Sequence, residues 1–174
     1  MRDDDQRHIK FTVDATQQVE DLRRQEEANK KNDPSYDAGK DNGATGSMMW
    51  PCPSCHTITS EFGWRYHPIY HTQKYHSGVD IGASYGASIV AADGGTVITA
   101  GAVSGYGNCV VINHGNGITT LYGHMSSIAV SSGQKVSKGQ TIGYVGSTGN
   151  STGPHLHWEV TVNGVRQNPL NYAR

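Results

Sequence analysis

Histidine and aspartate recur in two short segments that could hold a metal ion. His76 and Asp80 stand four residues apart, and His155 and His157 stand two apart further along the chain. On a strand, residues at a spacing of two point to the same face. Imidazole and carboxylate groups are zinc ligands, and a catalytic zinc site keeps one position open for water. The two segments together would offer His, Asp and His with a spare histidine beside them, and His124 is a fifth candidate, so this pattern favours an enzyme site.

Longer motifs surround these residues and follow one another in a fixed order. They are Ile58-Thr59-Ser60-Glu61-Phe62-Gly63-Trp64-Arg65, His67-Pro68, His76-Ser77-Gly78-Val79-Asp80-Ile81, Tyr122-Gly123-His124 and Gly153-Pro154-His155-Leu156-His157-Trp158-Glu159. In these motifs the chain resembles the lysostaphin-type zinc endopeptidases, also called M23 or LytM-like peptidases. The resemblance runs from about residue 50 to about residue 170 and leaves the first 49 residues outside it.

The resemblance implies a role for each histidine of the site. His76, Asp80 and His157 would bind one Zn²⁺ ion, which would activate a water molecule. His155 would be the general base that takes the proton of this water. His124 would be the second catalytic histidine and would hydrogen-bond the oxyanion that develops at the scissile carbonyl.

Other residues near these motifs have more than one interpretation. Glu159 shares the parity of His155 and His157, so it would hold a ring N–H of a metal ligand, form a salt bridge or lie at a solvated edge. Tyr70 lies in a loop over residues 65–75 that borders the groove by resemblance, and it is our candidate hydrogen-bond donor to substrate or oxyanion. Trp64 and Trp158 are expected in the core.

From Trp50 onward, short β-rich runs alternate with glycine-containing turns. The runs cover residues 88–92, 95–100, 109–113, 117–122, 141–145 and 157–162. This spacing predicts an all-β sandwich or barrel. The resemblance implies a compact, mostly antiparallel β-sandwich with the site in a groove flanked by loops. The glycine-rich loops 104–108 and 146–153 are candidates for the walls of that groove.

The first 49 residues differ in composition from the rest of the chain. They carry eleven acidic and eight basic residues, whereas residues 50–174 carry four and six. Apolar residues at helical spacing predict a charged helix over about residues 12–31 with Asp14 as its N-cap, and this helix could join a coiled coil or a larger assembly. Glycine, asparagine and aspartate then predict a flexible linker up to residue 47. We therefore expect two units, residues 1–49 and residues 50–174.

Three cysteines raise a separate question. Cys52 and Cys55 could form a disulfide in an oxidising compartment. Together with His56 they also match the C-x-x-C-H pattern of haem attachment, which would make the chain an electron-transfer protein. No partner methionine or set of haem-pocket helices is evident, so we favour the disulfide. Cys109 lies in a strand-like run and is expected to be a small buried residue.

Composition excludes several classes of partner and location. The sequence has no run of basic residues of the kind that indicates binding to nucleic acid. The sequence has no stretch of about 18 apolar residues, so no membrane span is predicted. Residues 1–5 lack the apolar run of a secretory signal. For a protein that acts at the cell wall we therefore expect either a piece of a longer chain or export by other machinery, such as a phage particle or a lysis system.

The sequence thus predicts a zinc metallopeptidase that hydrolyses an amide bond of bacterial peptidoglycan, in a cross-bridge or in a stem peptide. Two alternatives remain open at this stage. The domain could be a binding module that activates other cell-wall hydrolases and needs no zinc, or it could be the wall-cutting part of a phage tail or similar structure.

Overall fold

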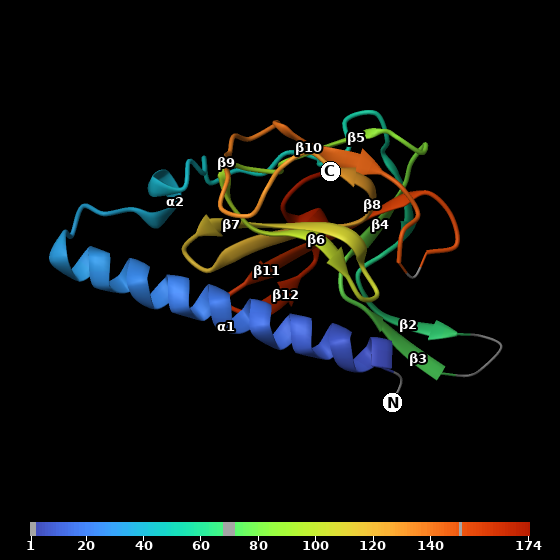
Figure 1. The fold of residues 1–174 in the computed structure, drawn as a ribbon, viewed down its shortest axis with the longest axis horizontal. Coiled ribbons are helices and arrows are strands. Elements are labelled where there is room, and N and C mark those ends of the chain that lie inside the picture. The colour runs from blue at the N-terminus through green and yellow to red at the C-terminus, as the bar shows by residue number, and fades with distance from the viewer. Residues whose placement is uncertain (1–2, 68–71, 150) are drawn as a thin grey trace.

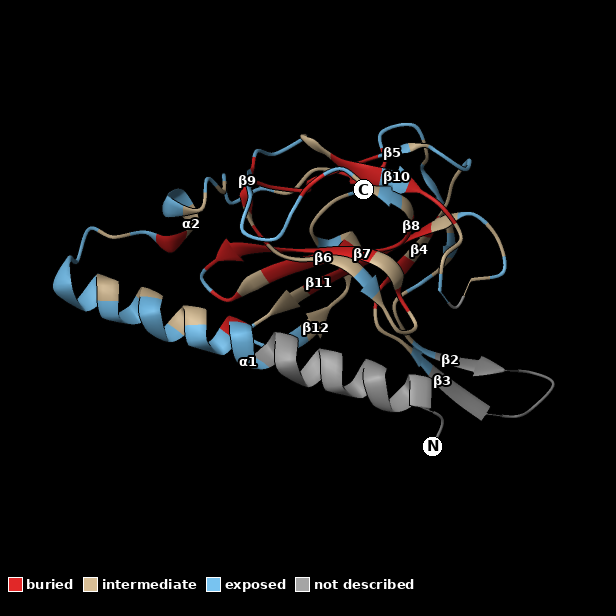
Figure 2. Ribbon diagram, in the orientation of Figure 1, coloured by how far each residue is buried: buried red, intermediate tan, exposed pale blue. Residues whose placement is uncertain are grey.

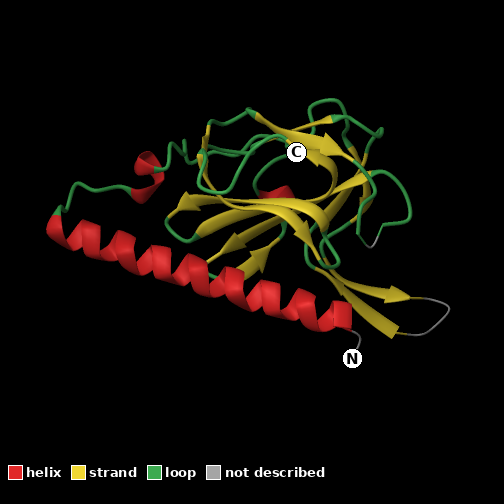
Figure 3. Ribbon diagram, in the orientation of Figure 1, coloured by secondary structure: helices red, strands yellow, loops and turns green. Residues whose placement is uncertain are grey.

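Two helices precede a β-rich body (Figure 3). This computed structural model describes the backbone of residues 3–67, 72–149 and 151–174, and the side chains of residues 17–64, 75–149 and 151–174. The helices are α1 (Asp3–Asn32), α2 (Ala38–Asp41) and a final 3-10 turn, η1 (Pro169–Asn171). Within the described residues, no helix is both long and apolar enough to cross a membrane.

In the described part of the chain, twelve strands lie between α2 and η1. They are β1 (Thr57–Ser60), β2 (Gly63–His67), β3 (Thr72–His76), β4 (Val79–Gly82), β5 (Ser88–Val90), β6 (Gly95–Val103), β7 (Gly107–Gly115), β8 (Ile118–Ile128), β9 (Lys135–Val136), β10 (Thr141–Val145), β11 (His155–Val162) and β12 (Val165–Gln167). All six of the β-rich runs predicted from the sequence are strands, and β6, β7 and β8 extend further than expected.

Ten of these strands form one antiparallel sheet. Its order is β1-β4-β11-β8-β7-β6-β9, with β10 paired to both β8 and β5, and β12 paired to β11. The first part of β8 pairs with β11 and its end pairs with β10. Through this shared strand, β10 and β5 come to lie over the rest of the sheet (Figure 1). The mostly antiparallel β fold expected from the sequence is confirmed.

The main apolar core lies between these two parts of the sheet. Trp158 of β11, Ile89 of β5 and Ile142 of β10 are fully buried there, and buried residues concentrate along the central strands (Figure 2). Because side chains alternate along a strand, the inward position of Trp158 places His157 and Glu159 on the opposite face of the sheet. The expectation that Trp158 belongs to the core is confirmed.

The segment around Trp64 differs from the expectation. Where a loop over 65–75 was expected, β2 and β3 pair antiparallel as a two-stranded hairpin. Trp64 is 70% exposed, so its assignment to the core is wrong. The hairpin lies outside the ten-stranded sheet, and the Trp64 ring packs only against Tyr75 among the described aromatic rings, at a centroid distance of 5.3 Å. Tyr70 lies outside the described residues.

Helix α1 begins earlier than predicted. It starts at Asp3, so Asp14 is inside the helix and is not its N-cap. No glycine or proline interrupts the chain before Pro34, and the helix therefore continues through the expected start. In its described half, Val19 is buried and Leu22 is half-buried, and Leu22 lines a hollow shared with β6 residues such as Thr96. Val19 and Leu22, the described part of the apolar stripe, are therefore covered at least partly by the chain itself.

The segment predicted to be a flexible linker makes specific contacts with the sheet. The Asp37 side chain caps α2 by accepting from Gly39 N at 2.8 Å and Lys40 N at 3.3 Å. Further on, the buried Asp93 carboxylate accepts from Thr45 N at 2.9 Å and from Gly46 N at 3.1 Å. The bonds to Asp93 attach the segment of residues 37–47 to the β-rich body. The division of the chain at residue 49 stays a prediction.

All three cysteines are free thiols. Cys52 and Cys55 close a turn in which Cys55 N donates to Cys52 O at 3.0 Å, and their disulfide stays a prediction. Cys109 is fully buried, as expected.

Candidate metal centre

Three strands bring the predicted metal ligands together. His76 ends β3, Asp80 lies on β4, and His157 lies on β11 directly opposite Asp80 in the strand register. His76 and Asp80 are thus on two strands joined by a tight connection. Gly78 makes that connection possible, because a Cβ atom there would stand 2.3 Å from the backbone oxygen of Trp158.

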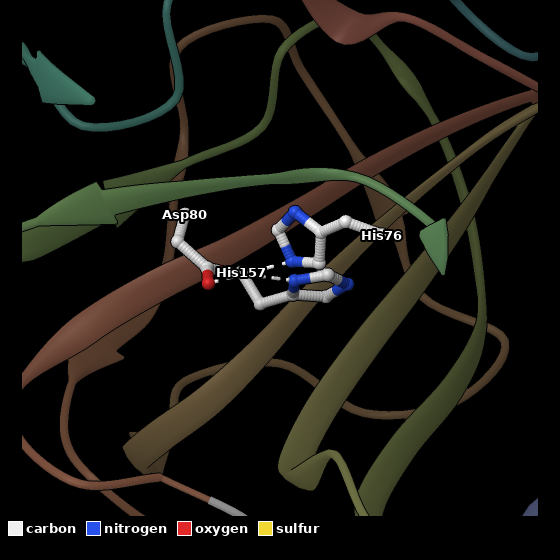
Figure 4. A group of neighbouring side chains, drawn as sticks. All are labelled: His76, Asp80 and His157. Carbon is white, nitrogen blue, oxygen red and sulfur yellow. Dashed lines mark hydrogen bonds and ion pairs between the residues drawn. The ribbon is translucent and has the colours of Figure 1, made fainter. Parts of the chain in front are cut away.

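The three side chains converge on one point (Figure 4). His157 Nδ1 lies 2.8 Å from Asp80 Oδ1, and His76 Nε2 lies 3.4 Å from Asp80 Oδ2. One donor atom from each residue falls within 4.8 Å of the other two. His157 is buried, whereas His76 and Asp80 are half-buried and face the surface.

This donor set fits a catalytic zinc ion. Two imidazole nitrogens and one carboxylate oxygen are three protein ligands of the kind that zinc binds, and such sites complete their coordination with water. Zn²⁺ with one carboxylate keeps a net charge of about +1, which favours activation of a coordinated water. The chemistry of the three residues and the closeness of their donor atoms therefore agree with the ion that the sequence predicts.

Two further histidines lie beside these ligands. His155 precedes His157 by two positions on β11, and its Nε2 is 3.6 Å from Asp80 Oδ1. The ring centroids of His155 and His124 are 4.6 Å apart. His124 has a left-handed φ of 61° at a point where the pairing of β8 with β7 shifts register. This local irregularity of the strand is a common way to aim a side chain at a site.

In each of the four histidines of the site, one ring nitrogen is hydrogen-bonded to an oxygen atom of another residue. His76 Nδ1 is 2.9 Å from Glu61 O, His124 Nδ1 is 2.6 Å from Thr148 O, His155 Nδ1 is 2.9 Å from Gly153 O, and His157 Nε2 is 2.8 Å from Glu159 Oε2. These oxygens can only accept, so each of the four nitrogens carries a proton. In the neutral form of each ring, the other nitrogen then presents a lone pair to the site.

This arrangement bears on the role of His124. The pKa of His124 is lowered to about 4, chiefly by burial and also by the neighbouring His155 and His157, while the bond to Thr148 opposes the shift. The ring is therefore neutral near pH 7, with its proton on Nδ1. Its Nε2 can accept a hydrogen bond, and it can donate one to an oxyanion only after it has gained a proton.

Charge is unevenly distributed among the ligands. Burial would raise the pKa of Asp80, but hydrogen bonds from His157 and His76 outweigh burial and hold the pKa well below its usual value. Burial would lower the pKa of His157, but its bonds to Asp80 and Glu159 outweigh burial and raise the pKa to about 9. Without a metal, His157 is thus a cation between two carboxylates, and a divalent ion would take the place of its Nδ1 proton.

Glu159 fulfils two of the roles considered for it and, being buried, does not lie at a solvated edge. It holds a ring N–H of His157 and also forms an ion pair with Arg166, whose Nε lies 3.1 Å from Glu159 Oε1. Tyr106 OH and Ser77 Oγ donate to the same carboxylate at 2.7 and 2.8 Å. The sequence analysis missed Tyr106 and Arg166, and neither residue has a spacing relative to the histidines that could have indicated this contact.

The two predicted groove loops meet beside His124. A Cβ at Gly107 would stand 2.4 Å from the carbonyl carbon of Thr148, and Asn108 N donates to Thr148 Oγ1 at 3.0 Å. Thr148 Oγ1 in turn donates to Met125 O at 2.7 Å. Thr148 therefore fixes the loop whose carbonyl holds His124. Its place in a glycine-rich run is the only sequence feature that pointed to this role.

Comparison with known families gives a match over most of the β-rich body. Residues 74–169 match the family described as Peptidase family M23. This range contains His76, Asp80, His124, His155 and His157.

Two curated relatives illustrate the range of functions among similar proteins. DD-carboxypeptidase/endopeptidase Mpg of Neisseria meningitidis is 47% identical over 116 residues, which are 67% of this chain and 27% of that protein. Murein hydrolase activator NlpD of Salmonella dublin is 36% identical over 124 residues, which are 71% of this chain and 31% of that protein. The chain thus spans about a third or less of the length of either relative.

Solved structures show the same fold. A zinc containing peptidase from Vibrio cholerae superposes with a TM-score of 0.67 at 35% identity, over 71% of this chain and 39% of that one. The catalytic domain of lysostaphin from Staphylococcus simulans superposes with a TM-score of 0.61 at 32% identity, over 67% of this chain and 91% of that one.

Proposed function

The chain belongs to peptidase family M23, and on this basis we propose that it is a zinc-dependent endopeptidase acting on bacterial peptidoglycan. The observation that carries the proposal is the convergence of His76, Asp80 and His157 within 4.8 Å, with His155 and His124 beside them. A site that only binds wall polymer has no need for this set of groups.

In the proposed mechanism, His76 Nε2, an Asp80 oxygen and His157 Nδ1 hold the metal. When bound, zinc would polarise the scissile carbonyl and bring the pKa of a water molecule down to about 7. His155 Nε2 presents a lone pair toward Asp80, so it can take the proton of that water and pass it to the leaving amine.

His124 contributes in a second way. Its neutral Nε2 would accept a hydrogen bond from the water in the ground state and would take the second proton of that water. The protonated ring would donate a hydrogen bond to the oxyanion before this proton also passes to the leaving amine. The ring therefore changes from acceptor to donor as the reaction advances. We keep Tyr70 as a proposed further donor to substrate or oxyanion.

We propose the peptide cross-link between D-residues as the bond that is cut. Support comes from two relatives whose names carry this specificity, Mpg at 47% identity and Peptidoglycan DD-endopeptidase ShyA of Vibrio cholerae at 40% identity over 136 residues. A protein with this substrate works in the periplasm or the cell wall, and we place this chain there. Carriage by a phage particle stays an alternative route to the same substrate.

Defined muropeptide dimers test the bond specificity. The zinc-loaded protein should convert dimers joined through D-residues into monomers, which mass spectrometry identifies, and should leave glycine-bridged dimers intact. Cleavage of the glycine bridge alone would contradict the proposed bond while keeping the peptidase assignment.

A second candidate function is activation of another wall hydrolase, as the name of the NlpD relative suggests. The retained ligand set and both catalytic histidines favour the peptidase instead. Assays with and without an added murein hydrolase separate the two functions, because an activator would release product only when the other enzyme is present and would keep this effect after zinc is removed.

A further inference from the structure

A buried carboxylate stands directly behind one of the proposed metal ligands. Glu159 has 3% of its surface exposed, and its Oε2 lies 2.8 Å from His157 Nε2. The opposite nitrogen of the same ring, Nδ1, points to Asp80. Glu159 is thus placed to fix the ring of His157 without touching the metal position itself.

Three other segments of the chain hold this carboxylate in place. Ser77 from the β3–β4 connection, Tyr106 from the β6–β7 turn and Arg166 from β12 all donate to it, at 2.8, 2.7 and 3.1 Å. With His157, four donors face one carboxylate, and no acceptor among these contacts competes with it. Such a pocket requires two acceptor oxygens, which a carboxylate supplies and an amide does not.

The charges around Glu159 are balanced without His157. The Arg166 guanidinium forms the ion pair with Glu159, so one positive group already offsets the buried negative charge. His157 can therefore lose its Nδ1 proton to a metal and keep its Nε2 proton on Glu159 without leaving the carboxylate unpaired. A buried carboxylate that lost its partner would otherwise be costly.

The hydrogen bond to Glu159 distinguishes His157 from the other histidines of the site. His76, His124 and His155 donate to backbone carbonyls, whereas His157 donates to an ionised side chain. A charge-assisted bond of this kind is stronger than a neutral one. It also makes the imidazole a better electron donor to a metal and holds its orientation.

We propose that Glu159, held by Arg166, Tyr106 and Ser77, is a positioning residue that orients His157 and strengthens its bond to the metal. The inference rests on the proposed function in one respect only, namely that His76, Asp80 and His157 bind zinc. It does not depend on which substrate is cut.

Glu159→Gln tests the proposal, because it keeps the size of the side chain and replaces one acceptor oxygen with a donor group. Zinc affinity is measured by competition with a chromophoric chelator on the full chain. We expect affinity to fall by about 10- to 100-fold relative to wild type, the range usual for partners of metal-ligating histidines. The rise in melting temperature on adding zinc should shrink with it.

Asp93→Asn is the matched control, since Asp93 is also a buried carboxylate with several donors but binds Thr45 and Gly46 away from the site. It should lower the melting temperature of the metal-free protein and leave zinc affinity unchanged. If Glu159→Gln likewise lowers only the melting temperature, Glu159 is merely structural and the proposal is overturned.

Glu159→Asp provides a second variant that keeps the charge beside Arg166 but shortens the reach to His157. It should fold and still bind zinc more weakly than wild type, so wild-type affinity in this variant would also overturn the proposal. The wild-type protein separates the two hypotheses. Zinc binding without peptidoglycan cleavage would refute the proposed function alone, whereas absence of zinc binding would refute the ligand set on which both rest.

Discussion

At the scale of single residues, the site depends on which ring nitrogen of each histidine donates to a neighbouring oxygen and which one is left to face the site. The sequence places His76, His155 and His157 in short motifs, but their tautomers depend on acceptors elsewhere in the chain. Glu61 O holds His76 and Gly153 O holds His155, each from a neighbouring loop. The result is a set of nitrogens aimed inward at Asp80, which is the arrangement that a metal site with an adjacent base requires.

Alanine variants of the two β11 histidines separate binding from catalysis. His157→Ala removes a ligand that lies 2.8 Å from Asp80, so it should abolish both bound zinc and peptidoglycan cleavage. His155→Ala removes only the proposed base and should keep stoichiometric zinc while lowering turnover by about 10²- to 10⁴-fold. Metal analysis and initial rates measured on the same samples check both variants.

His56→Ala is the control for these two variants, because its ring stacks on Trp50 and is outside the site. It should keep both zinc and turnover. Full activity of His155→Ala would show that another group is the base, and residual activity of His157→Ala would count against the ligand set.

The protonation of Glu159 predicts how the metal-free protein responds to acid. Burial would raise the pKa of Glu159, but His157, Arg166 and Tyr106 outweigh burial and lower it to about 2, from a usual 4.5. A pKa lowered by folding contributes stability that is fully present above pH 4.5 and is lost as the pH falls toward 2. Wild type should therefore lose stability over this range.

Glu159→Gln lacks this group and should show a shallower decline. Urea unfolding of both proteins between pH 6 and pH 2.5, with chelator present, measures the difference. Parallel curves for the two proteins would mean that Glu159 is not ionised in the folded state.

At the scale of elements, close backbone contacts between turns support the catalytic side chains. Gly107 begins β7 with a φ of +67°, and its Cα has no space for a side chain next to Thr148. The loop that carries Thr148 also carries Gly153, whose carbonyl holds His155. Both proposed catalytic histidines therefore depend on how tightly this loop packs against the β6–β7 turn.

Gly107→Ala should disturb the site strongly. The left-handed backbone costs about 1–2 kcal/mol for a residue with a Cβ, and the clash with Thr148 adds to it. Because the displaced loop holds His124 and His155, turnover should fall more than zinc affinity does.

Gly101→Ala is the matched control, since a Cβ at Gly101 meets no atom within 4 Å. It should leave stability and turnover close to wild type. Equal turnover in the two variants would show that the contact between the turns is not needed to position the histidines.

At the scale of the whole molecule, the N-terminal segment is attached to the peptidase body. The Glu26 side chain on α1 accepts from Asn116 N at 3.0 Å, in the β7–β8 turn. Figure 1 shows α1 running alongside the sheet. Further along, Thr45 and Gly46 occupy the acceptor atoms of Asp93. The segment before residue 50 thus contributes to the stability of the fold as well as linking α1 to it.

Truncation tests this contribution. A chain that starts at Met48 loses the donors of Thr45 and Gly46 and leaves the buried Asp93 with fewer partners. Its free energy of unfolding should fall by about 2 kcal/mol or more, given the usual cost of hydrogen bonds removed from a buried charge. Urea denaturation measures the change.

A chain that starts at Asp33 keeps residues 37–47 and serves as the control. It should be more stable than the chain that starts at Met48. Equal stability of the two shortened chains would show that residues 37–47 are only a linker.

Sequence reasoning predicted the fold class from local runs and turns, whereas the ligand set came from short histidine motifs together with the family resemblance and stays a prediction. The β-rich run at residues 157–162 predicted β11, and the parity of His155, His157 and Glu159 predicted their shared face. The roles of Thr148, Tyr106 and Arg166 could not be predicted from the sequence, because these roles come from pairings between distant segments. The assignment of Trp64 to the core was wrong because an exposed hairpin and a core strand have similar compositions.

Peptidoglycan hydrolysis with and without zinc tests the central claim most directly. Purified peptidoglycan is incubated with the zinc-loaded protein and, in parallel, with protein stripped by a chelator, and newly released amino groups are measured. The proposed function predicts release only in the zinc-loaded sample and its return when zinc is restored. Equal release from both samples, or no release from wall material of several chemotypes despite bound zinc, would contradict it.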